Sequence, residues 1–301
     1  MSLSRTNNVE IIGRLTDVEV REGEFPSNHH AYIEVNGNVR STINGKDMVF
    51  PVRFFSAKMK ADNTENKLYK SYLTIKPQLE GKIVRVQGSL SENRFYSARD
   101  KQMHSSIRIN GRFIAGRPES EPQKATFEIS GALISSPLEK RSKNKDGSEG
   151  EVYRYDVQLA QSNYGENNIE VYTFNIRPTD AAIKKGFEDK IPVGTSLTLI
   201  GDLEFTEETV TREDNTNVFF GEPIVKTFTN HTRNLFIRTA VGVNEGEEYA
   251  ADVLRGLIEA YKAKDKEIEE KAKSRESADS GSSEPAAESA PKVTTRQASL
   301  L

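Results

Sequence analysis

The sequence predicts an all-β protein of two tandem five-stranded barrels, followed by a C-terminal helix and a disordered tail. Three observations predict this class. Short alternating strands are separated by Gly and Asn turns, without the helix after each strand that a βαβ protein needs. The strand pattern of the first half recurs in the second half. The chain has 301 residues, which is room for about two domains of ~150 residues and an appendage.

The first half contains the clearer strand signals. Gly13 lies inside the first strand, where a glycine lets a strand bend around a barrel corner. We expect Asn-Gly turns at 36–37 and 44–45 to join the second and third strands. Residues 65–79 predict a helical stretch, because their apolar side chains recur at three-to-four spacing. The five expected strands cover residues 9–20, 31–35, 48–55, 82–95 and 103–114.

The second half repeats this order. Residues 126–133 echo residues 8–15, with Gly131 at the place of Gly13. Further along, Gly201-Asp202-Leu203 stands where the first half has Gly88-Ser89-Leu90. The ordered matches indicate a duplicated barrel. The expected elements are strands at 152–159, 169–176 and 197–205, and a helix at 180–189 capped by Thr179.

Composition suggests where the domains begin and end. The first domain covers residues 1–116 and the second covers residues 125–243, with a Pro- and Glu-containing linker at 117–124. Helix formers then predict a helix at 244–273, packed on the second barrel because its apolar stripe fades after Tyr261. Residues 274–301 are rich in Ser, Ala, Glu and Pro, and predict a disordered tail.

Charge is distributed unevenly along a chain whose net charge is −3. Residues 1–116 carry 18 basic and 12 acidic side chains, whereas residues 117–243 carry 15 basic and 20 acidic ones. Residues 244–301 carry 9 basic and 13 acidic side chains. Only the first domain therefore has the charge expected of a module that binds a polyanion.

Several functional classes lack support in the sequence. There is no cysteine, and the four histidines are not spaced to place two imidazoles on one helix face, so we expect no metal site. We find no phosphate-binding loop, nucleophile elbow or zinc-protease motif, and expect neither catalysis nor a cofactor. No apolar run approaches the roughly 18 residues of a membrane span, so we expect a cytoplasmic protein.

The first half carries an ordered series of motifs. The series begins with Asn-Val-Glu-Ile-Ile-Gly-Arg-Leu-Thr-Asp at 8–17 and continues through a strand ending at Phe54. It goes on through Glu-Gly-Lys-Ile-Val-Arg-Val-Gln-Gly-Ser-Leu at 80–90, then a basic-aromatic hairpin at 93–101 and a closing strand. Over about residues 7–115, this series resembles the bacterial single-stranded DNA-binding protein family, and the resemblance implies an OB-fold that binds single-stranded DNA.

The resemblance also suggests which residues bind. Phe54 matches an aromatic stacking position at the end of the third strand, although alternation along that strand equally allows it to be a core residue. Phe95 or Tyr96 matches a stacking aromatic among the basic residues of the hairpin. Nearby arginines and lysines are candidate phosphate contacts. The candidate DNA-binding residues are Phe54, Phe95, Tyr96, Arg94, Arg99, Lys101, Arg14, Arg53, Arg85 and Arg108.

The second half departs from that family. Its acidic balance disfavours DNA, although residues 140–145 form a basic loop that could touch DNA or be a solvated insertion. Its strand aromatics Tyr153, Tyr155, Tyr172 and Phe174 are expected in the core. The chain also lacks the acidic run, capped by an apolar tip, with which the family recruits replication proteins.

Several alternatives stay open. The main hypothesis is a single-stranded DNA-binding protein of replication or recombination, with replication or recombination proteins as possible partners. The duplicated layout favours a phage or other mobile element as its source, which would place it in the host cytoplasm, and a homodimer would present four barrels. A protein-interaction or virion-structural module, or an RNA-binding OB protein, would share these features.

Overall fold

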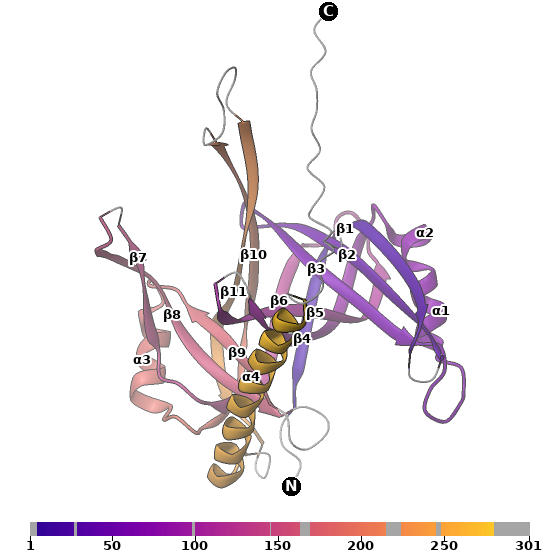
Figure 1. Cartoon of the computed structure of the whole chain (residues 1–301). Coiled ribbons are helices and arrows are strands. Elements are labelled where there is room, and N and C mark those ends of the chain that lie inside the picture. The colour runs from indigo at the N-terminus through magenta and orange to yellow at the C-terminus, as the bar shows by residue number, and fades with distance from the viewer. Residues whose placement is uncertain are drawn as a thin grey trace, which may run out of the picture.

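The computed structural model describes residues 5–26, 29–97, 100–144, 146–162, 169–214, 224–244 and 248–279, and it is dominated by β-strands (Figure 1). All the strands belong to one continuous eleven-stranded sheet. The elements are β1 (Asn7–Glu24), β2 (Ala31–Ile43), β3 (Lys46–Ala57), α1 (Lys67–Leu73), α2 (Ile75–Leu79), β4 (Ile83–Ser97), β5 (Gln102–Gly116), β6 (Lys124–Leu133), β7 (Leu138–Lys143), β8 (Glu149–Ser162), β9 (Ile169–Ile176), α3 (Ala181–Lys190), β10 (Ser196–Asp214), β11 (Ile224–Gly242) and α4 (Ala251–Asp279).

The strands of the first half pair in a ring. β1 pairs with β2, β2 with β3, β3 with β5, β5 with β4, and β4 with β1 again. All of these ladders are antiparallel except β3–β5, which is parallel. Five strands in this order, with helices α1 and α2 between the third and fourth, form the Greek-key barrel of the OB-fold. The fold predicted for the first half is therefore confirmed.

The second half has the same strand order. β6, β8, β9, β11 and β10 pair in a ring, and α3 lies between the third and fourth strands. Two of its ladders are short: β11 meets β9 at the pair Phe236–Asn175, and β6 meets β8 at two residue pairs. The extra strand β7 pairs with β8 at the edge of the sheet, so most of the predicted basic loop at 140–145 is strand. Residue 145 lies outside the described residues.

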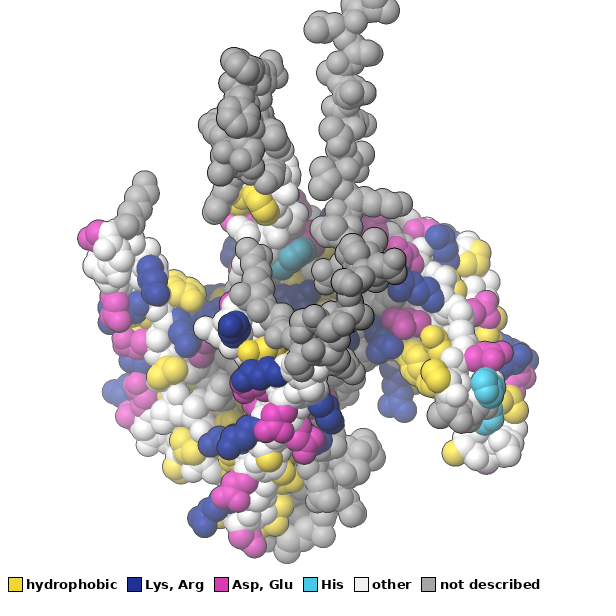
Figure 2. All heavy atoms as spheres, in the orientation of Figure 1, with side chains coloured by type: hydrophobic (Ala, Val, Ile, Leu, Met, Phe, Trp, Pro, Cys, Tyr) yellow, Lys and Arg dark blue, Asp and Glu magenta, His cyan; other side chains and the backbone are white. Residues whose placement is uncertain are grey.

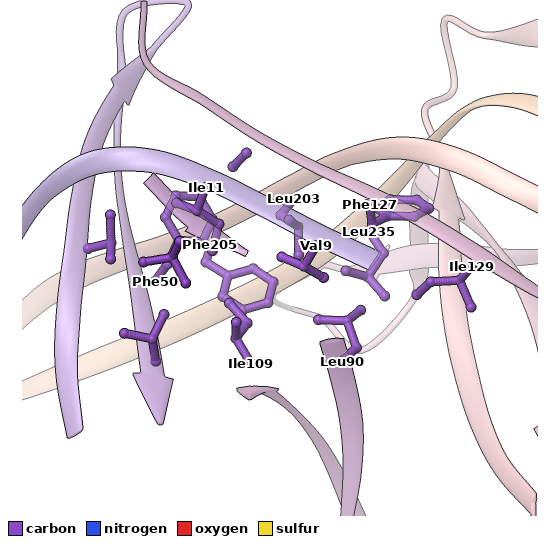
Figure 3. Close-up of a cluster of buried hydrophobic side chains, with 14 of the residues drawn as sticks. Val9, Ile11, Phe50, Leu90, Ile109, Phe127, Ile129, Leu203, Phe205 and Leu235 are labelled. Atoms are coloured by element: carbon purple, nitrogen blue, oxygen red, sulfur yellow. The ribbon is translucent and has the colours of Figure 1, made fainter. Parts of the chain in front are cut away.

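The two barrels share a hydrophobic core. β1 pairs with β6 over six residue pairs, which makes one sheet of the two halves. Figure 3 shows core residues of both halves packed together, including Val9 and Ile109 from the first and Leu203 and Leu235 from the second. The ring of Phe50 on β3 lies 5.4 Å from that of Phe205 on β10. The barrels are therefore fixed relative to each other by apolar packing as well as by backbone hydrogen bonds.

Glycines at matching positions of the two barrels allow close backbone approach. A Cβ on Gly88 would lie 2.1 Å from the Asn110 carbonyl oxygen, and one on Gly201 would lie 2.0 Å from the Phe236 carbonyl oxygen. Both glycines stand where the ladder register shifts. Gly13 and Gly131 likewise face backbone carbonyls of β2 and β8. The glycines of the predicted repeat thus have the same structural role in each half.

Some local predictions were wrong. Gly37 is not in a turn but inside β2, where it pairs with Val52. The turn lies only at Asn44-Gly45, whose φ angles of 52° and 75° suit a type I′ hairpin. The predicted helix at 65–79 is two short helices, α1 and α2. Thr179 does not cap α3, because the N-cap residue is Asp180 and no side chain caps the helix.

The C-terminal helix α4 packs on the second barrel, as predicted. Leu254 and Leu257 are buried against Ala160 of β8 and Val171 of β9. The helix begins at Ala251 and extends to Asp279, past the predicted end at 273, because a run of polar helix formers needs no apolar stripe to continue a helix. The rest of the predicted tail lies outside the described residues. Within the described part of the chain, no helix has the length and apolarity needed to cross a membrane.

We expect Gly88→Ala and Gly201→Ala each to lower the free energy of unfolding by about 1–3 kcal/mol, because the new methyl group would collide with a backbone oxygen. Gly256→Ala on the exposed side of α4 is the matched control. It meets no atom within 4 Å, so it should raise stability by roughly 0.5–1 kcal/mol. Urea unfolding of the three variants would measure this, and equal effects at the three sites would contradict it.

Candidate nucleic-acid interface

The outer face of β2 and β3 is the first part of the candidate interface. Side chains alternate along β3, so Phe50, Val52 and Phe54 point into the barrel while Arg53 and Phe55 point outward. Phe54 is only 1% exposed, and its ring packs against Tyr72 of α1 at 5.4 Å. The stacking role predicted for Phe54 is therefore wrong, and the core alternative is correct.

Three aromatic rings cluster on this outer face. Phe25 follows β1, Tyr32 lies on β2 and Phe55 lies on β3, with ring centroids 5.1–6.0 Å apart. Phe55 is 40% exposed, which is unusual for a large apolar side chain. The Arg53 guanidinium lies 5.0 Å from the centre of the Phe55 ring. It also donates two hydrogen bonds to Glu34, and these hold the pKa of that carboxyl below its ordinary value.

A groove of about 660 Å³ continues from Arg53 to the other barrel. One wall comes from β2, β3 and β5, and the other comes from β10 and β11. Buried apolar side chains, Val52, Ile109 and Phe205, form its floor. Three arginines line it: Arg53 and Arg108 from the first barrel and Arg233 from the second.

The three carboxylates that line this groove are each paired with an arginine. Glu34 pairs with Arg53 at 3.1 Å. Asp17 pairs with Arg40 at 3.3 Å. Glu19 pairs with Arg21 at 3.1 Å. Among the described residues, no carboxylate forms an ion pair with Arg108 or Arg233, so positive charge is in excess on this side of the groove.

The β4–β5 hairpin has an open outward face. Phe95 is 45% exposed, and its ring stacks on the His104 imidazole with centroids 5.6 Å apart and an interplanar angle of 21°. Alternation along β5 places His104, Ser106 and Arg108 on the same face. At about 3.3 Å per residue, this face runs some 13 Å from Arg108, which lines the groove, to His104 near the hairpin tip. Of the two predicted stacking residues, Phe95 is the one with an open ring.

Helix α4 covers the inward face of the same hairpin (Figure 1). Arg94 is only 13% exposed, and it pairs with Asp265 at 2.6 Å while its guanidinium lies 3.8 Å from the centre of the Tyr261 ring. Lys273 of α4 lies 5.8 Å from the centre of the Tyr96 ring. Figure 2 shows acidic and basic side chains interspersed along this helix. Arg94 and Tyr96 are therefore engaged by the chain itself.

A buried carboxyl group completes this contact. Glu92 of β4 accepts hydrogen bonds from the Tyr261 hydroxyl at 2.7 Å and from the Val171 amide at 3.1 Å. Burial raises the pKa of Glu92, and the hydrogen bond from Tyr261 opposes that rise. Burial also raises the pKa of Tyr261. The hairpin, β9 and α4 are thus joined by one polar network.

The other predicted residues lie outside this interface or at its edge. Arg14 pairs with Glu119 and Arg85 pairs with Glu10. Lys101 is exposed in the hairpin turn with φ of 56°, and residue Arg99 lies outside the described residues. Among the described residues, no group of three or more His, Asp or Glu could hold a metal ion.

The chain matches a known protein family over most of its length. A family model described as YorF matches residues 5–274, which span both barrels and most of α4. The chain belongs to the YorF family. A search of curated proteins finds no match.

Several solved structures resemble this YorF-family chain at low identity. A crystal structure of the single-stranded DNA-binding protein from Thermus aquaticus has 14% identity and a TM-score of 0.46, covering 82% of this chain and 98% of that one. A deletion mutant of the same protein has 15% identity and a TM-score of 0.44, with the same coverage. A mitochondrial single-stranded DNA-binding protein from S. cerevisiae has 13% identity and a TM-score of 0.27, covering 38% of this chain and 96% of that one.

Sequence reasoning missed part of the interface of this YorF-family protein. Alternation showed that Phe54 and Phe55 face opposite ways, but it could not tell which of them is exposed. Phe25 and Tyr32 flank the short segment between β1 and β2, and a pair of aromatics there is the signal that could have found them. No local signal points to Arg233, because it joins the groove from the other barrel.

We expect Asp265→Asn to loosen α4 from the hairpin, because Arg94 would lose its charged partner in a largely buried site. A hydrogen bond to a charged group contributes about 1.5–3 kcal/mol, so exchange protection around Tyr261 should fall on the order of ten-fold or more. Lys271→Ala is the control, since its pair with Glu267 is exposed and weak. Amide hydrogen exchange would measure both variants, and equal protection in both would contradict the expectation.

Proposed function

We propose that this protein binds single-stranded DNA without sequence preference, on the outer β2–β3 face of its first barrel. The observation that carries the proposal is the outward-facing cluster of Phe25, Tyr32 and Phe55, with the Arg53 guanidinium over the exposed Phe55 ring. The outer face of strands 2 and 3, with the loops beside it, is where OB-folds bind oligonucleotides. The cluster therefore lies where the fold offers a binding surface.

The chemistry of this face suits a single strand. Unstacked bases rest on aromatic rings, and stacking tolerates any base because every base has a π-face. Guanidinium groups replace the counterions along the phosphates, and such contacts carry no sequence information. The rings lie on the outer face, Arg53 lies beside them, and Arg108 lies further along the groove. This arrangement supports sequence-independent binding.

The hairpin extends the proposed surface. Phe95 and His104 form a second stacking platform, and Lys101 lies beside it at the exposed turn. In this proposal Arg94 and Tyr96 stay bound to α4. Arg14 and Arg85 do not line the groove that contains Arg53 and Arg108, so they contribute less.

The proposed biological role is the protection of single strands during DNA replication or recombination. The common strand order and the matching glycine contacts of the two barrels support an origin by duplication. We also propose a phage or mobile-element source, a location in the host cytoplasm, partner proteins of replication or recombination, and a homodimer that presents four barrels.

A salt titration tests the proposal. A labelled oligonucleotide should bind the full chain, and log K should fall against log salt with a slope near −0.7 per phosphate contact, or about −3 to −5 for four to seven contacts. Matched DNA and RNA oligonucleotides in competition would identify the preferred nucleic acid. Tighter binding of RNA would favour the RNA-binding alternative, and no binding at low salt would favour a protein-interaction module.

The aromatic cluster gives a sharper test. We expect Phe55→Ala to weaken oligonucleotide binding by roughly 1–3 kcal/mol, the contribution of one base–aromatic stack. Phe113→Ala is the matched control: its ring is 54% exposed and lies near Arg112 in the same way, but it faces a different groove. Fluorescence anisotropy would measure affinity, with thermal melts to check folding. Equal losses of affinity in both variants would indicate that the oligonucleotide does not bind at the aromatic cluster.

A further inference from the structure

We propose that Arg108 and Arg233 form a phosphate clamp between the two barrels, so that the second barrel takes part in binding. The ligand is a phosphodiester group of the single strand. This inference rests on the proposed function and goes beyond it, because it assigns a binding residue to the acidic half of the chain.

The position of Arg233 comes from β11. Its Nη1 donates a hydrogen bond to the carbonyl oxygen of Ile107 at 2.7 Å, and Ile107 directly precedes Arg108 on β5. Its guanidinium also lies 5.7 Å from the centre of the Phe205 ring on the groove floor. The backbone of the first barrel therefore holds the Arg233 guanidinium beside Arg108, the residue that carries the other guanidinium.

The charges at this point are not balanced. Burial lowers the pKa of Arg233, and the positive charge of Arg108 lowers it further. Glu207 opposes this effect, and its carboxylate also lies 3.2 Å from the His231 imidazole, so one carboxylate faces two guanidinium groups. The three carboxylates that line the groove are paired with Arg53, Arg40 and Arg21. Two like charges close together destabilise each other, and an anion between them relieves the repulsion.

The chemistry of the groups indicates phosphate. A guanidinium offers a rigid fork of donors that matches two phosphate oxygens, and two such forks suit a single tetrahedral anion. The groove volume of about 660 Å³ lies within the range of ligand sites. A phosphodiester is the anion that repeats along a single strand lying on the neighbouring β2–β3 face.

The β10–β11 arm extends this surface away from the barrels (Figure 1). Alternation places Thr209 and Thr211 of β10 on the face that carries Phe205, with Thr229 and Thr227 opposite them on β11. All four threonines are exposed. Their hydroxyls can donate hydrogen bonds to phosphate oxygens without adding charge. The DNA strand can therefore continue from the clamp along the β10–β11 arm.

The experiment compares Arg233→Gln and Arg108→Gln with Arg238→Gln in the full chain. Arg238 lies on the same strand β11, but it pairs with Asp202 and lines a different groove. Each clamp variant should reduce the magnitude of the salt slope for oligonucleotide binding by about 0.7, while the control leaves it unchanged. Arg233→Lys should keep the slope and lose several-fold in affinity, because charge remains and the fork is lost.

A second arm uses inorganic phosphate as the probe. At equal ionic strength, phosphate should raise the melting temperature of the wild-type chain more than chloride does, and Arg233→Gln should abolish the difference. An unchanged salt slope in Arg233→Gln, with weakened binding in Phe55→Ala, would overturn the clamp and leave the proposed function standing. Phosphate stabilisation without oligonucleotide binding would support the clamp as a free-phosphate site and overturn the proposed function. The absence of both oligonucleotide binding and phosphate stabilisation would overturn the clamp and the proposed function together.

Discussion

The pairing of β1 with β6 is the constraint on which the rest of this structure depends. β1 already belongs to the first barrel through β2 and β4, and its N-terminal part also pairs with the first strand of the second barrel. At the start of β1, the side-chain nitrogen Nδ2 of Asn7 donates hydrogen bonds of 3.0 Å to the Leu90 carbonyl oxygen and to Gln161 Oε1. The β-strand β1 thus contacts both barrels. The shared core behind it prevents one barrel from rotating against the other.

The groove is a consequence of that fixed arrangement. Because β10 and β11 run past the end of the first barrel, Phe205 can pack on Phe50, and Arg233 can reach the carbonyl of Ile107. Lys46 of β3 also pairs with Glu204 of β10 at 2.9 Å. These contacts hold a wall of the second barrel against the first. Neither barrel alone would have this groove.

What could be predicted from the sequence was local, and what could not was long-range. Alternation and the glycine repeat are local features of short stretches of chain, so most of the strands followed from them, although no expected strand covered β7 or β11. The dipeptide Asn-Gly occurs twice but makes a turn only at 44–45, because packing against β1 and β3 keeps Gly37 in a strand. Which of Phe54 and Phe55 is buried depends on the packing of Tyr72, which lies against the Phe54 side of β3. The capture of Arg94 by Asp265 joins residues 171 positions apart.

The equivalent face of the second barrel shows why the two halves differ in use. By strand order, β8 and β9 correspond to β2 and β3, whose outer face carries Arg53 and the aromatic cluster. On β8 and β9, the outward-facing apolar residues Ala160, Ile169 and Val171 are buried under α4.

A helix that seals this face excludes a nucleic acid from it, and the same helix then reaches the hairpin of the first barrel through Tyr261 and Asp265. In the second barrel, this face is therefore covered by a helix that also supports the first barrel's hairpin. Of the two equivalent faces, the outer β2–β3 face carries the exposed Phe55 ring and Arg53, which is why the proposed site lies there.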